Sequence, residues 1–425
     1  MSADQKRMSD IKQEDSNVFV FPKKSRYKPD NLAPYIAANL PTEGPLWMKE
    51  MRGQALARLK SAGLPTPKLE RWKYINLTRA LKSMELSFGK AQIEVTGARD
   101  CVRDYIDAQD KYKITLSRPA FGSNAYKDMM LADYAQAYSR DGLIVDIAED
   151  KSEDKVLNIV HTGTNNQIDI VNTLFVIRAG ASATIIENHT GEAGEAYWKN
   201  ILSRIIMEQG ACLTHIRIQD DSQESVHTQN TEIEIADNAQ YKGFTLTSGG
   251  ALSRHQIHAR IQGSHADCTL NGVNMLHSTQ SGDTTITIDH LEPDSTSNQF
   301  YRTVLNDKAR GVFQGKVHVH QKAQRTDGYQ LANALMLSDM AEMDTKPELE
   351  IYADDVKCSH GATTGQLEDE PLFYMKSRGI PEKQAKKLLM LSFLAEVTDQ
   401  IEHKETRERI EGEIETWLND ALEKI

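Results

Sequence analysis

The sequence predicts a mainly β protein whose core is a β-solenoid, with helical segments at both ends. Between about 140 and 345, short β-branched runs such as TEIEI alternate polar and apolar residues and are separated by Gly, Asn, Asp and Ser. A small corner residue precedes four of these runs, at intervals of 30, 28 and 27 residues: Ala181, Ala211, Ala239 and Ala266. A recurrence near 28 residues, with about two strands in each unit, is typical of stacked coils. A β-sandwich, the alternative, would show irregular spacing.

Helical spacing of apolar residues marks both ends of the chain. In 44–65 apolar residues recur at near-helical spacing until Gly63 and Pro65 end the helix. After Pro381, two further helices carry broad apolar stripes, which need a partner surface in the protein itself or in another subunit. We therefore expect four parts: a flexible lead-in (1–30), an N-terminal helical domain with the entry to the core (31–139), the parallel β-helix core (140–358) and a C-terminal helical domain (359–425).

Composition and charge narrow the class of protein. A net charge of −11 argues against a nucleic-acid partner, because a phosphate-binding face needs concentrated Lys and Arg. No apolar run approaches the roughly 18–20 residues that cross a bilayer, so no membrane contact is expected, and the polar N-terminus lacks the apolar segment of a secretion signal. The four scattered cysteines form neither a CxxC pair nor a disulfide framework. These features favour a protein of the reducing cytoplasm.

The segment VKCSHGATTG (356–365) holds the main candidate for chemistry. Cys358 and His360 are two residues apart, so on a strand they share a face. Thiolate and imidazole together suit zinc, copper or an iron–sulfur cluster, but two ligands are too few for a closed site. Side chains placed in this way rarely converge as a nucleophile and its base. On the residues alone, a structural cysteine beside a surface histidine remains the alternative.

A second pair, His318 and His320 in GKVHVHQK, repeats this spacing. A cupin-like metal site would add a Glu and a third His at defined spacings, and that set is not present. We interpret both as surface histidines of a strand. Neither a GxxxxGK[ST] phosphate loop nor a GxGxxG motif after a strand occurs, which argues against ATPase or dinucleotide chemistry in this chain.

Two longer stretches resemble the SufB/SufD family of SUF iron–sulfur cluster assembly proteins. The stretch PELEIYADDVKCSHGATTGQLEDEPLFYMKSRGIPEKQAKKLLMLSFLAEV (347–397) is similar to the C-terminal signature of that family, and LPTPKLERWKYINL (64–77) is similar to its N-terminal element. The compact chain with few cysteines resembles the SufD-type branch. The resemblance implies a right-handed parallel β-helix flanked by N- and C-terminal helical domains, which agrees with the repeat.

The same resemblance implies partners and a role. SufD-type chains are expected in a SufB–SufC–SufD complex, in which the ABC-type ATPase SufC docks on the C-terminal helices and the β-helix edges of the SufB and SufD-type subunits pair. Cys358 and His360 would lie at the SufB junction and bind iron or a nascent, transient iron–sulfur cluster, with His360 favoured and further ligands from SufB. The implied function is a non-catalytic scaffold, because ATP hydrolysis belongs to SufC. No flavin-binding motif is visible.

Two alternatives remain at this point. A β-helical carbohydrate-active enzyme would carry clustered Asp or Arg/Lys along a groove, whereas DDS (220–222) is more simply interpreted as a turn. A plain scaffold would assist iron entry without a ligand of its own. A chain without SufB could also form a homodimer through the same edge.

Overall fold

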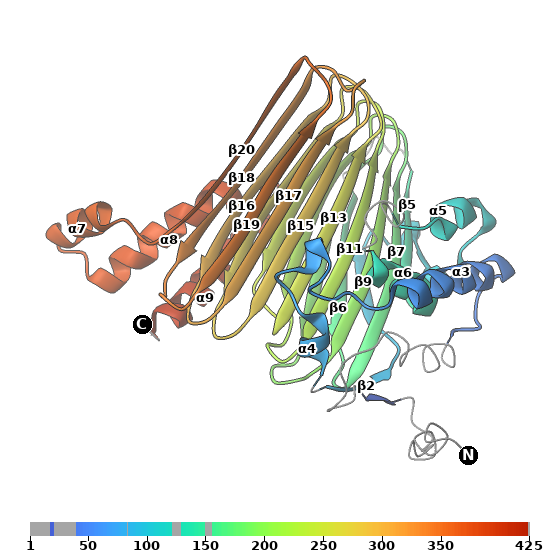
Figure 1. Cartoon of the computed structure of the whole chain (residues 1–425), viewed down its shortest axis with the longest axis horizontal. Helices are drawn as coiled ribbons and strands as arrows, with labels where there is room; N and C mark the ends of the chain where they lie inside the picture. The colour runs from blue at the N-terminus through green and yellow to red at the C-terminus, as the bar shows by residue number, and fades with distance from the viewer. Residues whose placement is uncertain (1–17, 21–39, 83, 121–128, 149–154, 424–425) are drawn as a thin grey trace.

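The computed structural model describes residues 18–20, 40–82, 84–120, 129–148 and 155–423, and most of the expected lead-in (1–30) lies outside them. The dominant feature is a parallel β-solenoid of about seven turns (Figure 1). Each turn gives one strand to each of two sheets. The first sheet contains β7 (Gln167–Ile177), β9 (Trp198–Met207), β11 (Val226–Ile235), β13 (Leu252–Ile261), β15 (Ser281–His290), β17 (Arg310–Val319) and β19 (Glu342–Ile351). The second contains β6 (Lys155–Gly163), β8 (Ser182–Gly191), β10 (Cys212–Asp220), β12 (Gln240–Thr247), β14 (Asp267–Leu276), β16 (Thr296–Leu305), β18 (Thr326–Met336) and β20 (Val356–Gly365).

Strands pair in register with the equivalent strand of the next turn. Cys212 in β10, for example, pairs with Ser182 of β8 on one side and with Gln240 of β12 on the other. Both partners are one sequence repeat away, so the predicted period of about 28 residues is confirmed as one turn of the solenoid. Backbone groups are thus satisfied between coils, and the fold does not need a closed barrel.

The predicted corner residues lie at one corner of successive coils. The residue before each corner alanine has a positive φ, at Gly180 (70°), Gly210 (68°), Asn238 (58°) and His265 (56°). Glycine and asparagine adopt this left-handed conformation at low cost. The Gly210 amide donates to the Asp237 carbonyl in the next turn, over 2.9 Å. The corner repeat therefore combines a backbone requirement with a small buried side chain.

The corner conformation leads to a stability prediction. An added Cβ at Gly210 would have its nearest neighbour 3.9 Å away, so there is space for it and only the positive φ opposes the substitution. We therefore expect Gly210→Ala to lower the free energy of unfolding by ~1–2 kcal/mol. The matched control is Gly53→Ala in α3 (Leu46–Ala62), where an added Cβ has no atom within 4 Å and φ is helical, so stability should rise by ~0.5–1 kcal/mol. Chemical denaturation measures both. Equal effects of the two substitutions would contradict the assignment of this corner.

Apolar side chains fill the solenoid interior. Alternate residues of each strand point inward, so Ala183 and Ile185 of β8 are buried in the core while Ser182 is exposed. The core continues through consecutive turns with Ile205, Leu213, Ile233, Tyr241, Ile257, Leu270, Ile288 and Phe313. These stacked rows are what the period-two pattern predicted.

The N-terminal part packs on the outer face of the first sheet. The helix predicted in 44–65 is confirmed as α3, and Gly63 ends it with a φ of 74°. Tyr134 stacks on Trp198 of β9, with ring centroids 5.3 Å apart. The other elements described here are β1 (Val18–Val20), η2 (Glu70–Trp72), α4 (Leu77–Leu81), β2 (Glu85–Phe88), β3 (Gln92–Gly97), η3 (Arg99–Cys101), β4 (Val102–Asp104), η4 (Tyr105–Asp107), η5 (Asp110–Tyr112), α5 (Lys113–Ser117), α6 (Met130–Tyr138) and β5 (Leu143–Ile147).

This N-terminal part also contains strands, where helices were expected. β3 pairs with β6 antiparallel, and β2 and β5 pair with β7. Local spacing could not predict these short strands, because their conformation is fixed by pairing with the first coil. They pair with the edge at which the solenoid begins, and proteins rarely leave the backbone N–H and C=O groups of such an edge unprotected.

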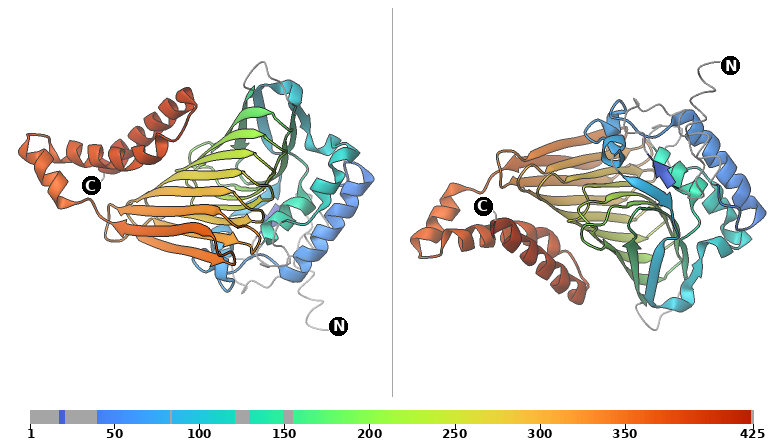
Figure 2. Two further views of the ribbon diagram at one scale, coloured as in Figure 1. Left: turned by 90° about the horizontal axis from the view of Figure 1, so that it is seen from above. Right: turned by 90° about the horizontal axis from the view of Figure 1, so that it is seen from below.

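The C-terminal helices are α7 (Asp369–Ser377), α8 (Glu382–Thr398) and α9 (Lys404–Glu423). Of these, α8 and α9 pack on the outer face of the second sheet, whereas α7 lies away from it (Figure 2). The apolar stripe after Pro381 is buried against this sheet through Met390, Leu394, Ile414 and Leu418. The protein's own sheet is therefore the partner surface that this stripe needs. β20 continues to Gly365, beyond the expected domain boundary at 358.

None of the described helices is long and apolar enough to cross a membrane.

Candidate functional site

The last coil leaves both sheets with an open edge, and the candidate residues lie on it. In the described chain β19 pairs only with β17, and β20 pairs only with β18. Figure 1 shows these strands at the end of the solenoid opposite the first coil. One N-terminal element, η2, reaches this end, because Lys346 of β19 forms an ion pair with Glu70 at 2.9 Å. β20 spans ten residues and includes both Cys358 and His360. The prediction that the two residues share a strand is confirmed.

Cys358 and His360 differ in their surroundings. Cys358 pairs with Gly328 and is half-buried, packing next to Val317 and Leu349 from the opposite sheet. Burial raises the pKa of its thiol. His360 shares this face by strand alternation but is exposed at the open end. Among the described residues, neither belongs to a cluster of three potential metal ligands.

Backbone amides of β20 point alternately to β18 and to the open edge. Asp327 of β18 donates its N–H to the Ser295 carbonyl beside β16. Because backbone groups alternate in direction along a strand, the N–H and C=O groups of the even-numbered residues of β18 point to β20. In a parallel ladder, a residue forms its hydrogen bonds with the two neighbours of its partner. Because Gly328 is paired with Cys358, the odd-numbered residues of β20 are the ones hydrogen-bonded to β18. Cys358, His360 and Ala362 therefore direct their N–H and C=O groups outward. This edge offers the backbone groups that another strand would need.

The two terminal strands are not equally suited to pairing. β19 (EMDTKPELEI) carries Pro347 at its centre and several charged side chains. Proline and charge on an edge strand discourage pairing with another chain. β20 (VKCSHGATTG) has no proline and one formally charged residue, Lys357. The candidate residues thus lie on the edge that is open to strand addition.

His318 and His320, interpreted above as surface histidines, lie in a small cluster on the outer face of the first sheet. Asp289 Oδ1 lies 2.9 Å from His318 Nδ1, and its Oδ2 lies 2.7 Å from His258 Nε2. The rings of His318 and His320 are 4.1 Å apart between centroids. Asp289, His318 and His320 form a partly buried group of three potential ligands, which the sequence did not reveal because Asp289 is contributed by the preceding turn.

Polar and charged groups also fill the interior of the first coils, and this was not foreseen. The turn expected at DDS (220–222) contains a buried carboxylate, Asp221, which accepts from Lys199 Nζ at 2.6 Å and contacts His227 Nδ1 at 2.9 Å. The neighbouring buried group consists of His161, Glu187 and His189. In each sheet, residues about 28 apart lie side by side, so the spacing of His161 and His189 was the signal that could have identified this group.

Asp169 in this region predicts a dependence of stability on pH. Burial raises its pKa to about 7, an effect that Lys199 only partly opposes. Between pH 4 and 7 the folded state therefore keeps a proton that the unfolded chain releases, so stability falls as pH rises through this window. Asp169→Asn should stabilise the protein at pH 8 by up to ~4 kcal/mol and have little effect near pH 4.

Denaturation at several pH values tests this, with the exposed Glu382→Gln as the control. The pKa of Glu382 is lowered, so its substitution should add no pH dependence above about pH 5. An effect of Asp169→Asn that is the same at every pH would contradict the prediction.

The fold and the edge together define a parallel β-solenoid protein with an uncovered last coil. The family model for the SUF system FeS cluster assembly, SufBD core domain, matches residues 159–393, which is more than half of the chain. The chain therefore belongs to the SufBD family, and a role in iron–sulfur cluster assembly follows. The matched region includes Cys358 and His360.

Curated relatives carry the same family names. The Escherichia coli K12 "Iron-sulfur cluster assembly protein SufD" is 28% identical over 380 residues, covering 84% of this chain and 90% of the relative. A SufBD family protein of Mycobacterium leprae is 30% identical, covering 67% of this chain and 74% of the relative. A Synechocystis SufBD family protein is 37% identical but covers 54% and 52%, respectively. These matches do not support the alternative of a carbohydrate-active enzyme.

Proposed function

We propose that this chain is a non-catalytic scaffold subunit, in the SufD position, of a SufB–SufC–SufD complex that assembles iron–sulfur clusters. The observation that carries the proposal is the open β20 edge, where outward-facing backbone groups lie beside Cys358 and His360. Strand addition at such an edge obtains affinity from main-chain hydrogen bonds and specificity from side chains. The last strand of SufB would pair with β20.

His360 is the residue that we assign to iron, which is the cargo of this junction. An exposed imidazole on the open edge can offer its neutral nitrogen to a metal held between two chains. Burial raises the pKa of Cys358, so this thiol is protonated near neutral pH and is a poorer ligand until a metal displaces the proton. The remaining ligands would come from SufB.

We further propose that SufC docks on α7. This helix has no buried residue and lies away from the solenoid at the far end of the C-terminal helices (Figure 2). Phe373 and Tyr374 on it are 74% and 58% exposed. Exposed aromatic side chains are the usual energetic centres of protein interfaces. ATP hydrolysis in SufC would move the C-terminal helices and, through them, the junction.

The free cysteines agree with a location in the cytoplasm. All four are free in the structure, and two of them, Cys101 and Cys268, are buried. Free thiols persist in a reducing compartment, so we place the protein in the cytoplasm.

Co-expression tests the proposed function. The tagged chain should co-purify with SufB and SufC in a constant ratio, and the anaerobically isolated complex should contain iron and acid-labile sulfide. A chain that purifies alone or only as a homodimer from the same cells would contradict the heteromeric assignment. A complex without iron would contradict the assembly role.

A further inference from the structure

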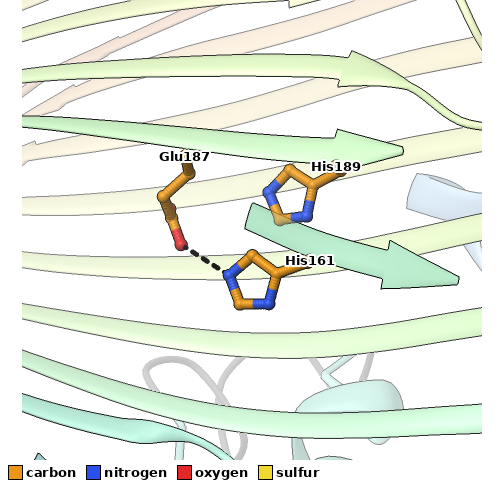
Figure 3. Close-up of side chains that lie close together, drawn as sticks. All are labelled: His161, Glu187 and His189. Carbon is orange, nitrogen blue, oxygen red and sulfur yellow. Dashed lines mark ion pairs between the residues drawn. The ribbon is translucent and has the colours of Figure 1, made fainter. Parts of the chain in front are cut away.

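Three potential metal ligands meet inside the solenoid, far along the chain from the β20 edge. His161 of β6 and Glu187 and His189 of β8 lie close together in the first coils (Figure 3). Their side chains are 3%, 0% and 1% exposed, respectively. One ligand atom from each lies within 4.8 Å of the others.

The repeat itself brings these residues together. His161 pairs with His189 in the parallel ladder, and Glu187 is two residues before His189 on the same inward face. The two imidazole rings are stacked with centroids 4.8 Å apart. The three side chains thus project from two adjacent, fully paired strands, which fix their positions.

The group has more polar atoms than hydrogen-bonding partners. Both ring nitrogens of His161, both ring nitrogens of His189 and Oε1 of Glu187 are buried without a hydrogen bond. His161 Nε2 lies 3.4 Å from Glu187 Oε1, which is an ion-pair distance but long for an N–H···O hydrogen bond. Buried polar atoms are normally paired, so a concentration of them at one point indicates a ligand.

Neighbouring groups orient the ligands without competing for them. His215 Nε2 donates to Glu187 Oε2 at 2.8 Å, while its Nδ1 contacts Tyr241 Oη at 2.9 Å, and this leaves Oε1 directed to His161. Lys199 donates to Asp221 and to two backbone carbonyls, and Arg217 contacts Gln229 and His227. Both cations therefore have acceptors of their own.

The protonation state favours metal binding. Burial lowers the pKa of His189 well below its usual value, and the positive charges of Arg217 and Lys199 lower it further. The Glu187 carboxyl has a lowered pKa because its contacts with His161 and His215 outweigh burial. A neutral imidazole and a carboxylate are the forms that bind a metal.

We propose that His161, Glu187 and His189 form a buried site for a divalent first-row transition metal ion such as Zn²⁺ or Fe²⁺. Two imidazoles and one carboxylate are a ligand set that suits these ions. Metal–ligand bonds of ~2.0–2.2 Å require the three donors to move closer together than they are here. Because the side chains are buried on paired strands, the ion enters as the coils form and then exchanges slowly. This site does not depend on the proposed function of the β20 edge.

The test uses Co²⁺ as the probe. The full chain is produced in medium supplied with Co²⁺, dialysed against EDTA, and analysed for metal content and visible absorption. We expect about one ion per chain, with the absorption of low-coordinate Co²⁺ with nitrogen ligands. His189→Asn and Glu187→Gln should lose most of this metal. Glu187→Gln keeps the shape of the side chain and an acceptor for His215, so this variant tests the site even if His189→Asn does not fold.

Two matched controls locate the ion. His290 is a buried histidine whose ring nitrogens both contact serine hydroxyls at 2.8 Å, so His290→Asn removes an imidazole but no proposed ligand. His320→Asn removes a ligand of the outer Asp289 cluster. Both should keep the metal. A wild-type chain without retained Co²⁺, retention in both inner variants, or loss only in His320→Asn would overturn the proposal.

Discussion

Ala362→Pro is expected to weaken assembly with SufB markedly while leaving the chain folded. Ala362 is exposed on β20, and its N–H points to the open edge, so proline removes a donor that the neighbouring β18 does not use. A carbonyl of the partner strand then loses its hydrogen bond inside the interface, at a cost of about 1–3 kcal/mol, or ~5–150-fold in Kd. Size-exclusion chromatography of the mixed subunits measures the loss.

The matched control at this position is Ala362→Val, which adds bulk but keeps the N–H. It should assemble nearly as well as the wild type. Thermal unfolding of the isolated Ala362→Pro chain should be close to that of the wild type, since its own ladder is unchanged. Normal assembly of the proline variant would show that β20 is not the strand that pairs.

Phe373→Asp is expected to remove SufC from the complex. Its side chain is 74% exposed on α7, which makes no buried contact of its own, so the substitution should not affect folding. If Phe373 is an interface anchor, its loss costs at least ~2 kcal/mol, or about 30-fold in Kd, and the added charge must also be desolvated. Pull-down of SufC by the tagged chain measures the effect.

Ile114→Asp gives the matched control for this experiment. Ile114 is 84% exposed on α5, which belongs to the N-terminal part of the chain. The same charge is introduced there without touching α7. SufC binding that is weakened equally by both substitutions, or by neither, would contradict docking on α7.

The repeat could be predicted from the sequence because it reflects two local requirements. Each turn needs a left-handed residue and then a small buried one at the corner, as at Gly210 and Ala211, and its strands need inward apolar residues. Both requirements leave a periodic signal. The short strands β2 and β3 left none, because pairing with the first coil fixes their conformation.

The candidate site could be predicted only in part. Cys358 and His360 are close in sequence, so their common strand was predictable. Asp289 and His318 belong to different turns, as do His161 and His189, and such groups become visible only when the register is known. The apolar stripe of α8 and α9 left a choice between an internal and an external partner, and only tertiary packing identifies the second sheet as its cover.

The measurement that tests the central claim most directly is the iron and acid-labile sulfide content of the SufB–SufC–SufD complex, isolated anaerobically with wild-type chain, His360→Ala or Cys358→Ala. Mutation of a residue that only orients a metal ligand typically costs about 10–100-fold in metal affinity, so loss of the ligating imidazole itself should cost at least as much. The account predicts that His360→Ala loses most of both elements at an unchanged subunit ratio, and that Cys358→Ala loses less. Wild-type content in His360→Ala would contradict it and assign the ligands to SufB alone.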